Sequence, residues 1–234
     1  MSGALAERLA AVRERIAGAA RRSGRAPEDV TLLGACKRMP AALVIEAVKA
    51  GLTHLGENYV QEATAKIAEV NAALPTPPRW HLIGSLQRNK AKDAVRHFAM
   101  VETLDRVSLA RELDKRARAA GRSMPVLLQV NLSREEQKSG ALEEDLPALL
   151  EACAELEALD VQGLMTVPAL DPDPDHSRPA FAALRELRDR LREVPGGDAL
   201  AHLSMGMSAD FEVAIEEGAT LVRVGTAIFG PRPG

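Results

Sequence analysis

Lys37 is the side chain in this sequence best placed to form a covalent bond with a ligand. It follows directly after residues 31–36, a short apolar run with the composition of a buried strand. A lysine at the rim of a dry site is partly desolvated, which lowers the pKa of its ammonium group and exposes a nucleophilic amine. Schiff-base formation needs that amine. The competing interpretation is a solvated lysine that opens a loop, and position alone favours this second view.

Two glycine-containing segments near the end of the chain have the features of a phosphate site. They are residues 204–210 and residues 223–230, and each begins in or follows a short apolar run. Ser208 stands where a helix is expected to begin, so its hydroxyl either caps that helix or binds an anion there. Gly225 permits close approach of the backbone, and the amides of Gly225 and Thr226 are candidates for phosphate contacts. The alternative is an ordinary helix cap followed by a tight turn.

Asp210 weighs against phosphate binding beside Ser208. A carboxylate in the first turn of a helix interacts favourably with the helix dipole, but it repels a neighbouring phosphate unless it points away. The sequence leaves the direction of this side chain open.

The chain alternates between short apolar segments and helical segments, with one helix ahead of the first apolar segment. We expect that helix at residues 4–22, where apolar residues recur at helical spacing. Strands are expected at 31–36, 53–56, 80–84, 98–102, 125–131, 159–167, 201–205 and 220–224. Alternating strands and helices predict a parallel sheet covered by helices.

Eight such units in 234 residues predict an α/β fold, a single (β/α)8 TIM-type barrel with an extra N-terminal helix. Residues 1–234 would then form one domain. An open, doubly wound sheet is the alternative, but the chain lacks the glycine-rich and P-loop sequences of its nucleotide-binding versions. Chemistry in a barrel sits at the C-terminal ends of the strands, and phosphate often binds after strands seven and eight. Lys37, Ser208 and Gly225 all fall at that end.

Composition and charge exclude several classes of function. The chain carries 30 Lys and Arg against 33 Asp and Glu, a formal net charge of -3, so no broad basic surface indicates nucleic acid. No apolar run is long enough to span a membrane, and the first 25 residues lack a signal core. Cys36 and Cys153 do not form the paired motif of a zinc or thioredoxin-like site. We therefore expect a cytoplasmic protein without nucleic-acid or membrane partners.

The motifs together resemble the pyridoxal phosphate homeostasis proteins, a family similar to the barrel domain of bacterial alanine racemase. The matching segments are Lys37, 56–58 (Gly-Glu-Asn), 80–90 (Trp-His-Leu-Ile-Gly-Ser-Leu-Gln-Arg-Asn-Lys), 130–133 (Val-Asn-Leu-Ser), 138–140 (Lys-Ser-Gly), 163–165 (Gly-Leu-Met) and 203–208 (Leu-Ser-Met-Gly-Met-Ser) through Gly230. They span nearly the whole chain in order. The resemblance implies pyridoxal 5′-phosphate (PLP) as the cofactor, and a part in intracellular vitamin B6 homeostasis through storage or delivery.

The same resemblance implies roles for individual residues. Lys37 matches the lysine that forms the internal aldimine with the cofactor. The phosphate-binding positions are matched by Ser208, Gly225 and Thr226. Arg223 matches an arginine that faces the pyridine nitrogen.

Two further positions, which line the cofactor pocket in the family, are matched by Asn58 and Met205. The sequence departs from the family at Cys36 and Arg38, because members more often carry a small hydroxyl residue before the lysine. That departure bears on a polar contact at this point and leaves the role of Lys37 unchanged.

Arg223 also bears on whether the protein is an enzyme. An arginine offers only donors and stays protonated, so it keeps the ring nitrogen unprotonated and weakens the cofactor as an electron acceptor. Racemases of this type add a tyrosine from a separate β domain, which we expect to be absent here. Tyr59 is the only tyrosine and is expected to pack at the start of a helix, while His81 and His202 are expected to be core residues.

We therefore expect a non-enzymatic, monomeric PLP carrier, with PLP-dependent apo-enzymes as candidate partners. A low-activity PLP-dependent amino-acid racemase is one alternative, and a barrel that binds a partner with an incidental lysine is another. Lys138 either attracts an anion or is a solvated loop lysine. A small basic cluster is formed by Arg88, Lys90 and Lys92.

Overall fold

Eight parallel strands form a closed barrel in the computed structural model, which describes residues 2–135, 137–168, 171 and 173–231. The strands follow one another around the barrel in sequence order, and the last pairs with the first. They are β1 (Thr31–Ala35), β2 (His54–Glu57), β3 (Arg79–Leu82), β4 (Met100–Leu104), β5 (Met124–Val130), β6 (Leu159–Thr166), β7 (His202–Ser204) and β8 (Leu221–Val224). The predicted (β/α)8 barrel is confirmed.

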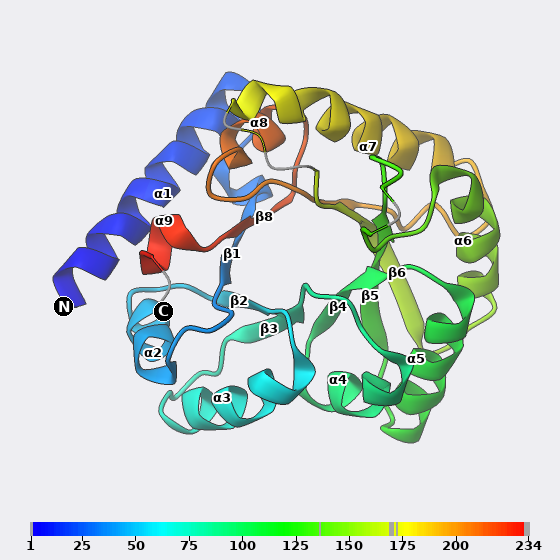
Figure 1. Cartoon of the computed structure of the whole chain (residues 1–234), viewed down its shortest axis with the longest axis horizontal. Helices are drawn as coiled ribbons and strands as arrows, with labels where there is room; N and C mark the ends of the chain where they lie inside the picture. The colour runs from blue at the N-terminus through cyan, green and yellow to red at the C-terminus, as the bar shows by residue number, and fades with distance from the viewer. Residues whose placement is uncertain (1, 136, 169–170, 172, 232–234) are drawn as a thin grey trace.

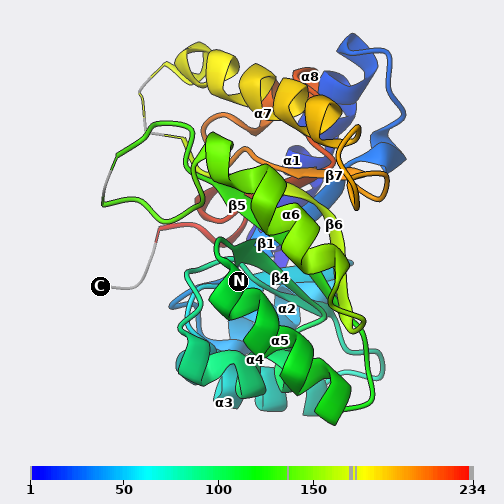
Figure 2. The same cartoon turned by 90° about the vertical axis from the view of Figure 1, so that its right-hand side faces the viewer.

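Helices surround the strands on the outside of the barrel (Figure 1). The α-helices are α1 (Ser2–Arg22), α2 (Ala41–Lys49), α3 (Val60–Ala72), α4 (Ala91–His97), α5 (Val107–Ala119), α6 (Leu146–Ala154), α7 (Arg178–Leu191), α8 (Phe211–Glu216) and α9 (Thr226–Phe229). Short 3-10 helices occur at η1 (Pro27–Asp29), η2 (Arg88–Lys90), η3 (Glu143–Asp145) and η4 (Pro174–Ser177). Helices α5 and α6 lie side by side on the outer surface (Figure 2). The expected N-terminal helix is α1, which contacts α8 and α9.

Side chains alternate along each strand between the barrel interior and the helices outside. A small apolar cluster in the interior, separate from the main core, is formed by Met100, Leu127 and Met165. Two residues further along β4, Glu102 lies on the same face as Met100 and is fully buried. The interior therefore changes from apolar to polar toward the C-terminal ends of the strands.

Strand β3, expected at 80–84, is Arg79–Leu82, and two other elements also differ from the sequence-based expectation. Strand β4 begins at Met100, whereas residues 98–102 were expected, because Phe98 still donates its N–H to Ala94 and closes helix α4. Helix α9 was not expected at all. It has four residues, too few for a periodic apolar pattern to signal it.

Within the described residues, no helix combines the length and apolar character needed to cross a membrane.

Candidate functional site

A cavity of about 440 Å³ opens at the C-terminal ends of the strands. Its lining comes from the ends of strands β1, β2, β3, β6, β7 and β8, so residues far apart in the sequence meet there. The lining residues are Ala35, Lys37, Met39, Asn58, Ile83, Val167, Met207, Ser208, Ala209, Arg223, Gly225 and Thr226. Six of the seven residues proposed from the sequence are among them; Met205 is the exception.

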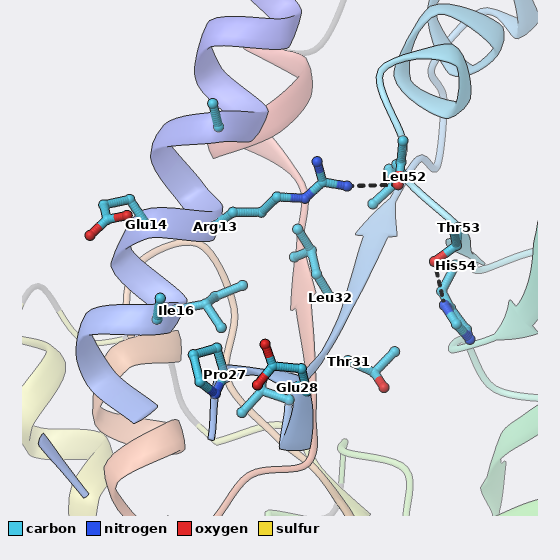
Figure 3. Close-up of a pocket in the computed structure, with 14 residues that line it drawn as sticks. Arg13, Glu14, Ile16, Pro27, Glu28, Thr31, Leu32, Leu52, Thr53 and His54 are labelled. Carbon is cyan, nitrogen blue, oxygen red and sulfur yellow. Dashed lines mark hydrogen bonds between the residues drawn. The ribbon is translucent and has the colours of Figure 1, made fainter. Parts of the chain in front are cut away.

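A second cavity, of about 610 Å³, lies at the other end of the barrel, between α1 and the starts of β1 and β2 (Figure 3). Arg13 extends from α1 and donates to the carbonyl oxygen of Gly51 at 2.6 Å. Thr53 and His54 are hydrogen bonded to each other at 3.0 Å. No lysine occurs among the described residues of this lining, and Arg13 already holds the backbone of the α2–β2 loop. We therefore place the candidate site in the smaller cavity, at the end where barrels of this fold carry their chemistry.

Lys37 lies in a tight turn after β1, and its side chain is half-buried. Ala35, the last residue of β1, and Lys37, in the turn after it, both line the cavity. The N–H of Met39 donates to the carbonyl oxygen of Cys36 at 3.0 Å and closes the turn. Arg38 inside the turn has a φ of 59°, in the left-handed region. The backbone thus turns sharply at the residue that carries the amine.

Ser208 does not begin the helix that follows it. Helix α8 starts at Phe211 with Asp210 as its N-cap residue. The Ser208 hydroxyl instead accepts the N–H groups of Gly225 at 3.1 Å and Ala227 at 3.3 Å, at the start of α9. The two glycine-containing segments are therefore joined directly, through a hydroxyl and backbone amides that line one cavity.

Gly225 packs so closely that a side chain would not fit easily. A Cβ atom added there would lie 3.2 Å from the carbonyl oxygen of Ala35, at the end of the neighbouring strand β1. The backbone at Gly225 thus reaches both β1 and the cavity, and a larger residue would have to move one of them.

Asp210 uses both oxygens of its carboxylate in hydrogen bonds within the protein. Its Oδ1 accepts the N–H of Met207 at 2.7 Å, and its Oδ2 accepts the hydroxyl of Ser177 at 3.0 Å. The side chain is buried and does not line the cavity. The sequence raised the possibility that this carboxylate repels a phosphate beside Ser208. In the structure both of its oxygens are occupied by hydrogen bonds, and the side chain lies outside the cavity lining.

Arg223 is buried in the barrel interior and reaches the cavity from β8. Its Nη1 donates to the hydroxyl oxygen of Ser204 at 2.6 Å, and its Nη2 donates to the carbonyl oxygen of Thr166 at 2.7 Å. Burial lowers the pKa of Arg223, and the negative charges of Glu102 and Asp210 oppose that change. Two acceptors and nearby carboxylates thus hold a charged guanidinium inside the barrel.

Glu102 is the counter-charge of this interior network. Its Oε2 accepts the hydroxyl of Ser204 at 2.5 Å, and its Oε1 lies 2.7 Å from Nδ1 of His81. Burial raises the pKa of Glu102, but the hydrogen bonds from His81 and Ser204 and the charge of Arg223 outweigh it, so the pKa is lowered. Sequence reasoning missed Glu102 and Ser204; the available signal was a polar residue inside an apolar strand segment.

Met205 does not lie where the family resemblance placed it. Its side chain is fully buried in the hydrophobic core and does not line the cavity. Met207, two residues later, does line it. Tyr59 stands at the N-cap of α3 but is 50% exposed, so the expectation that it packs there was wrong.

A smaller cavity of about 270 Å³ adjoins the first and shares Asn58, Ile83 and Val167 with it. Lys138 lines this neighbour, and its Nζ is paired with Oε1 of Glu135 at 2.5 Å. The basic cluster of Arg88, Lys90 and Lys92 lines neither cavity.

The donor set of the main cavity suits an anion that also carries an electrophilic carbon. Lys37 and Arg223 supply two cationic groups, while Ser208 and nearby backbone amides supply neutral hydrogen-bonding groups. No Asp or Glu occurs among the described residues that line it. In the described part of the chain, no cluster of His, Cys, Asp or Glu is arranged to hold a metal ion.

Comparisons with known proteins agree with this geometry. Residues 8–233 match the family described as alanine racemase, N-terminal domain. The chain is 47% identical to the pyridoxal phosphate homeostasis protein of Pseudomonas aeruginosa, over 97% of this chain and 96% of that protein. It is 46% identical to the protein of the same name in Aquifex aeolicus, over 97% of each chain.

One of the similar solved structures contains a bound cofactor. PipY of Synechococcus elongatus, solved with PLP bound, superposes with a TM-score of 0.85 and is 39% identical to this chain. The match covers 97% of this chain and 100% of PipY.

Proposed function

This chain belongs to the pyridoxal phosphate homeostasis proteins of the alanine racemase N-terminal domain family, and we propose that it binds PLP in the cavity at the C-terminal ends of its strands. There it takes part in PLP homeostasis by storing or delivering the cofactor. One observation carries the proposal. An amine, a guanidinium and a hydroxyl bonded to backbone amides line one cavity without a carboxylate among its described lining residues.

The residues present fit the proposed cofactor. Its phosphate needs hydrogen-bond donors, which Ser208 and the backbone around Gly225 and Thr226 supply from one part of the lining. The close packing of Gly225 against β1 leaves only a bare backbone at that point. The volume of about 440 Å³ falls in the usual range for small-ligand sites.

Lys37 is the proposed point of covalent attachment. When bound, PLP supplies an aldehyde that condenses with a primary amine, releasing water. Lys37 carries the only amine among the described residues of the cavity lining, so it is the group we propose for this bond.

Arg223 favours holding the cofactor over transforming it. Its guanidinium is fixed by Ser204 and Thr166 and offers donors only, so it would leave the ring nitrogen unprotonated. Tyr59, the only tyrosine in the sequence, does not line the cavity and so supplies no acid there. We therefore propose a carrier that is not a racemase, that acts as a monomer, and that passes PLP to PLP-dependent apo-enzymes.

Spectral titration of the purified protein with PLP tests this function. We expect the wild type to acquire a visible band with one site per chain, and Lys37→Ala to lose it. Pyridoxal without phosphate should bind far more weakly, because the groups around Ser208 then lack their anion. Equal binding of the two compounds would contradict the phosphate assignment. Sustained racemisation of an amino acid by the loaded protein would contradict the carrier role, and light scattering on the same sample tests the monomer.

A further inference from the structure

A buried ion pair lies directly behind the turn that carries Lys37. Nζ of Lys66, from α3, is 2.6 Å from Oε1 of Glu57, the last residue of β2. The side chains are 12% and 0% exposed, respectively. Neither residue lines the cavity. Any effect of the ion pair on the cavity must therefore pass through residues that contact both.

Lys66 also holds the backbone immediately before Lys37. Its Nζ donates to the carbonyl oxygen of Cys36 at 2.9 Å. The same oxygen accepts the N–H of Met39, the bond that closes the turn. The ammonium and the turn thus share one acceptor, one peptide away from the amine that we propose to bind the cofactor.

Cys36 is hydrogen bonded to the last two residues of β2, Gly56 and Glu57. The Cys36 thiol donates to Oε1 of Glu57 at 3.3 Å, and the Cys36 N–H donates to the carbonyl oxygen of Gly56 at 3.0 Å. Burial, together with the neighbouring carboxylate, raises the pKa of the Cys36 thiol, which keeps it protonated as a donor. Cys36 is therefore fixed to the end of β2 by both its backbone and its side chain.

Glu57 is connected to two more lining residues of the cavity. Its carbonyl oxygen accepts the N–H of Ile83 at 2.8 Å, and the next residue in the chain is Asn58. Ile83 and Asn58 both line the cavity. Lys37, Asn58 and Ile83 come from three neighbouring strands, and all three are one step away from this ion pair.

The turn needs such support because its backbone is strained. Arg38 adopts a φ of 59°, a conformation that residues other than glycine rarely adopt. Strained conformations persist only where the surroundings enforce them. The carbonyl pinned by Lys66 is two residues before Arg38, so the ion pair supplies part of that enforcement.

The pair is also poorly suited to a purely stabilising role. Among the described residues, Oε2 of Glu57 has no hydrogen-bond partner although it is buried. A buried ion pair with an unsatisfied oxygen is no more stabilising than well-packed apolar side chains of the same size. The contacts that the pair makes with the Lys37 turn therefore point to a positioning role.

We propose that Lys66 and Glu57 are positioning residues that fix the Lys37 turn, so that the Lys37 amine stays in the cavity and is the amine PLP reacts with. This inference rests on the proposed function. Loss of the ion pair frees the turn. Lys37 then no longer reacts with PLP in preference to the exposed lysines of the surface.

Labelling with PLP followed by borohydride, with peptide mapping, tests the inference. We compare wild type, Lys66→Met and a matched control, Arg118→Met, which removes a cation from another buried carboxylate, Asp114, at 2.7 Å. Thermal unfolding of all three reports the stability lost. We expect Lys66→Met to weaken PLP binding by roughly tenfold or more, as misplacement of a reacting group does. Its label should also spread from Lys37 to other lysines.

The control should lose stability while keeping its affinity and its label on Lys37. Lys66→Arg keeps the charge and the donors, so it should restore most of the selectivity. Equal affinity and equal selectivity in Lys66→Met and Arg118→Met would overturn the inference and leave the proposed function intact. A wild type that takes no label on Lys37 would overturn both. Should Lys66→Met fail to fold, Glu57→Gln is measured in the same way with the same outcomes.

Discussion

Arg223 can remain charged inside the barrel because its neighbours supply two acceptors and a counter-charge. The chain of contacts runs from Arg223 through the Ser204 hydroxyl to Glu102, and on to His81. Each member of the chain forms a hydrogen bond with the next, and buried charge is tolerated when it is paired and hydrogen bonded in this way. The Ser204 hydroxyl is the link between the guanidinium and the carboxylate, so its removal interrupts the chain without deleting either charge.

Replacement of Ser204 by alanine should weaken both the fold and the site. Nη1 of Arg223 and Oε2 of Glu102 would each lose a partner, at a cost of about 1–3 kcal/mol in unfolding free energy. PLP affinity should also fall, because the guanidinium is no longer held. Urea unfolding and spectral titration measure the two effects. The control is Ser177→Ala, which removes a buried hydroxyl from Asp210 and should lose stability while PLP affinity is retained. Equal PLP affinity in Ser204→Ala and Ser177→Ala would contradict the role of Ser204.

His54 should make the fold sensitive to acid. Burial lowers its pKa from 6.5 to about 4, with His81 and Arg79 acting in the same direction and Glu102 opposing them. Between these values the unfolded chain binds the proton and the folded chain does not, so stability falls as the pH drops through this window. We expect the urea midpoint to be lower at about pH 5 than at about pH 7, and the difference to shrink in His54→Gln. An unchanged difference would show that His54 is not its source.

The sequence locates the residues of the cavity better than it locates their partners. Lys37 and Gly225 follow strands, and strand ends of a barrel meet at one rim, so their proximity could be predicted. Met205 does not line the cavity but Met207 does, because Gly206 between them has a φ of 89° and interrupts the alternation of the strand. The partners Ser204 and Glu102 are 102 residues apart, and no local pattern joins them.

At the scale of elements, close packing between strands depends on residues without side chains. Gly163 in β6 faces β7 so closely that an added Cβ would lie 2.0 Å from the carbonyl oxygen of His202. That oxygen belongs to the backbone, so it cannot rotate out of the way. The spacing of β6 and β7 therefore requires glycine at this position.

Gly163→Ala should destabilise the protein by at least about 1–3 kcal/mol, since overpacking forces the backbone to shift. Gly3→Ala is the matched control, because nothing lies within 4 Å of a Cβ added at that helical position. Alanine there should be neutral or slightly stabilising. Denaturant unfolding of both variants measures the contrast, and equal midpoints would contradict the close approach of the strands.

Elements with a clear apolar pattern were predictable, and the short helix α9 was not. Helix α1 follows from its apolar spacing, and the eight strands follow from short apolar runs. Helix α9 has only four residues, so its pattern is indistinguishable from a loop. That omission also hid the partner of Ser208, since the amides it binds are at the start of α9.

At the scale of the whole molecule, α1 ties the start of the chain to its end. Arg8 donates to the carbonyl oxygen of Ile228, and Arg25, just after α1, donates to those of Ile215 and Ala219. Arg22 pairs with Glu216 of α8 at 2.9 Å. These contacts lie beside the β1–β8 pairing that closes the barrel. We propose on this basis that residues 1–234 behave as one domain.

A single domain should unfold in a single cooperative step. Trp80 in β3 is the only tryptophan and is 3% exposed, so its fluorescence reports on one side of the barrel. Circular dichroism reports on the helices all around it. We expect the two unfolding curves in urea to coincide, and a separate transition in either signal would contradict the assignment of one domain.

The most direct test of the account is the position at which borohydride fixes PLP to the protein. The purified protein is saturated with PLP, its spectrum is recorded before and after reduction, and the reduced chain is digested and mapped. The account predicts a visible band that reduction abolishes, and one label per chain on the peptide containing Lys37. A protein that stays colourless and unlabelled, or one labelled equally well in Lys37→Ala, would contradict it.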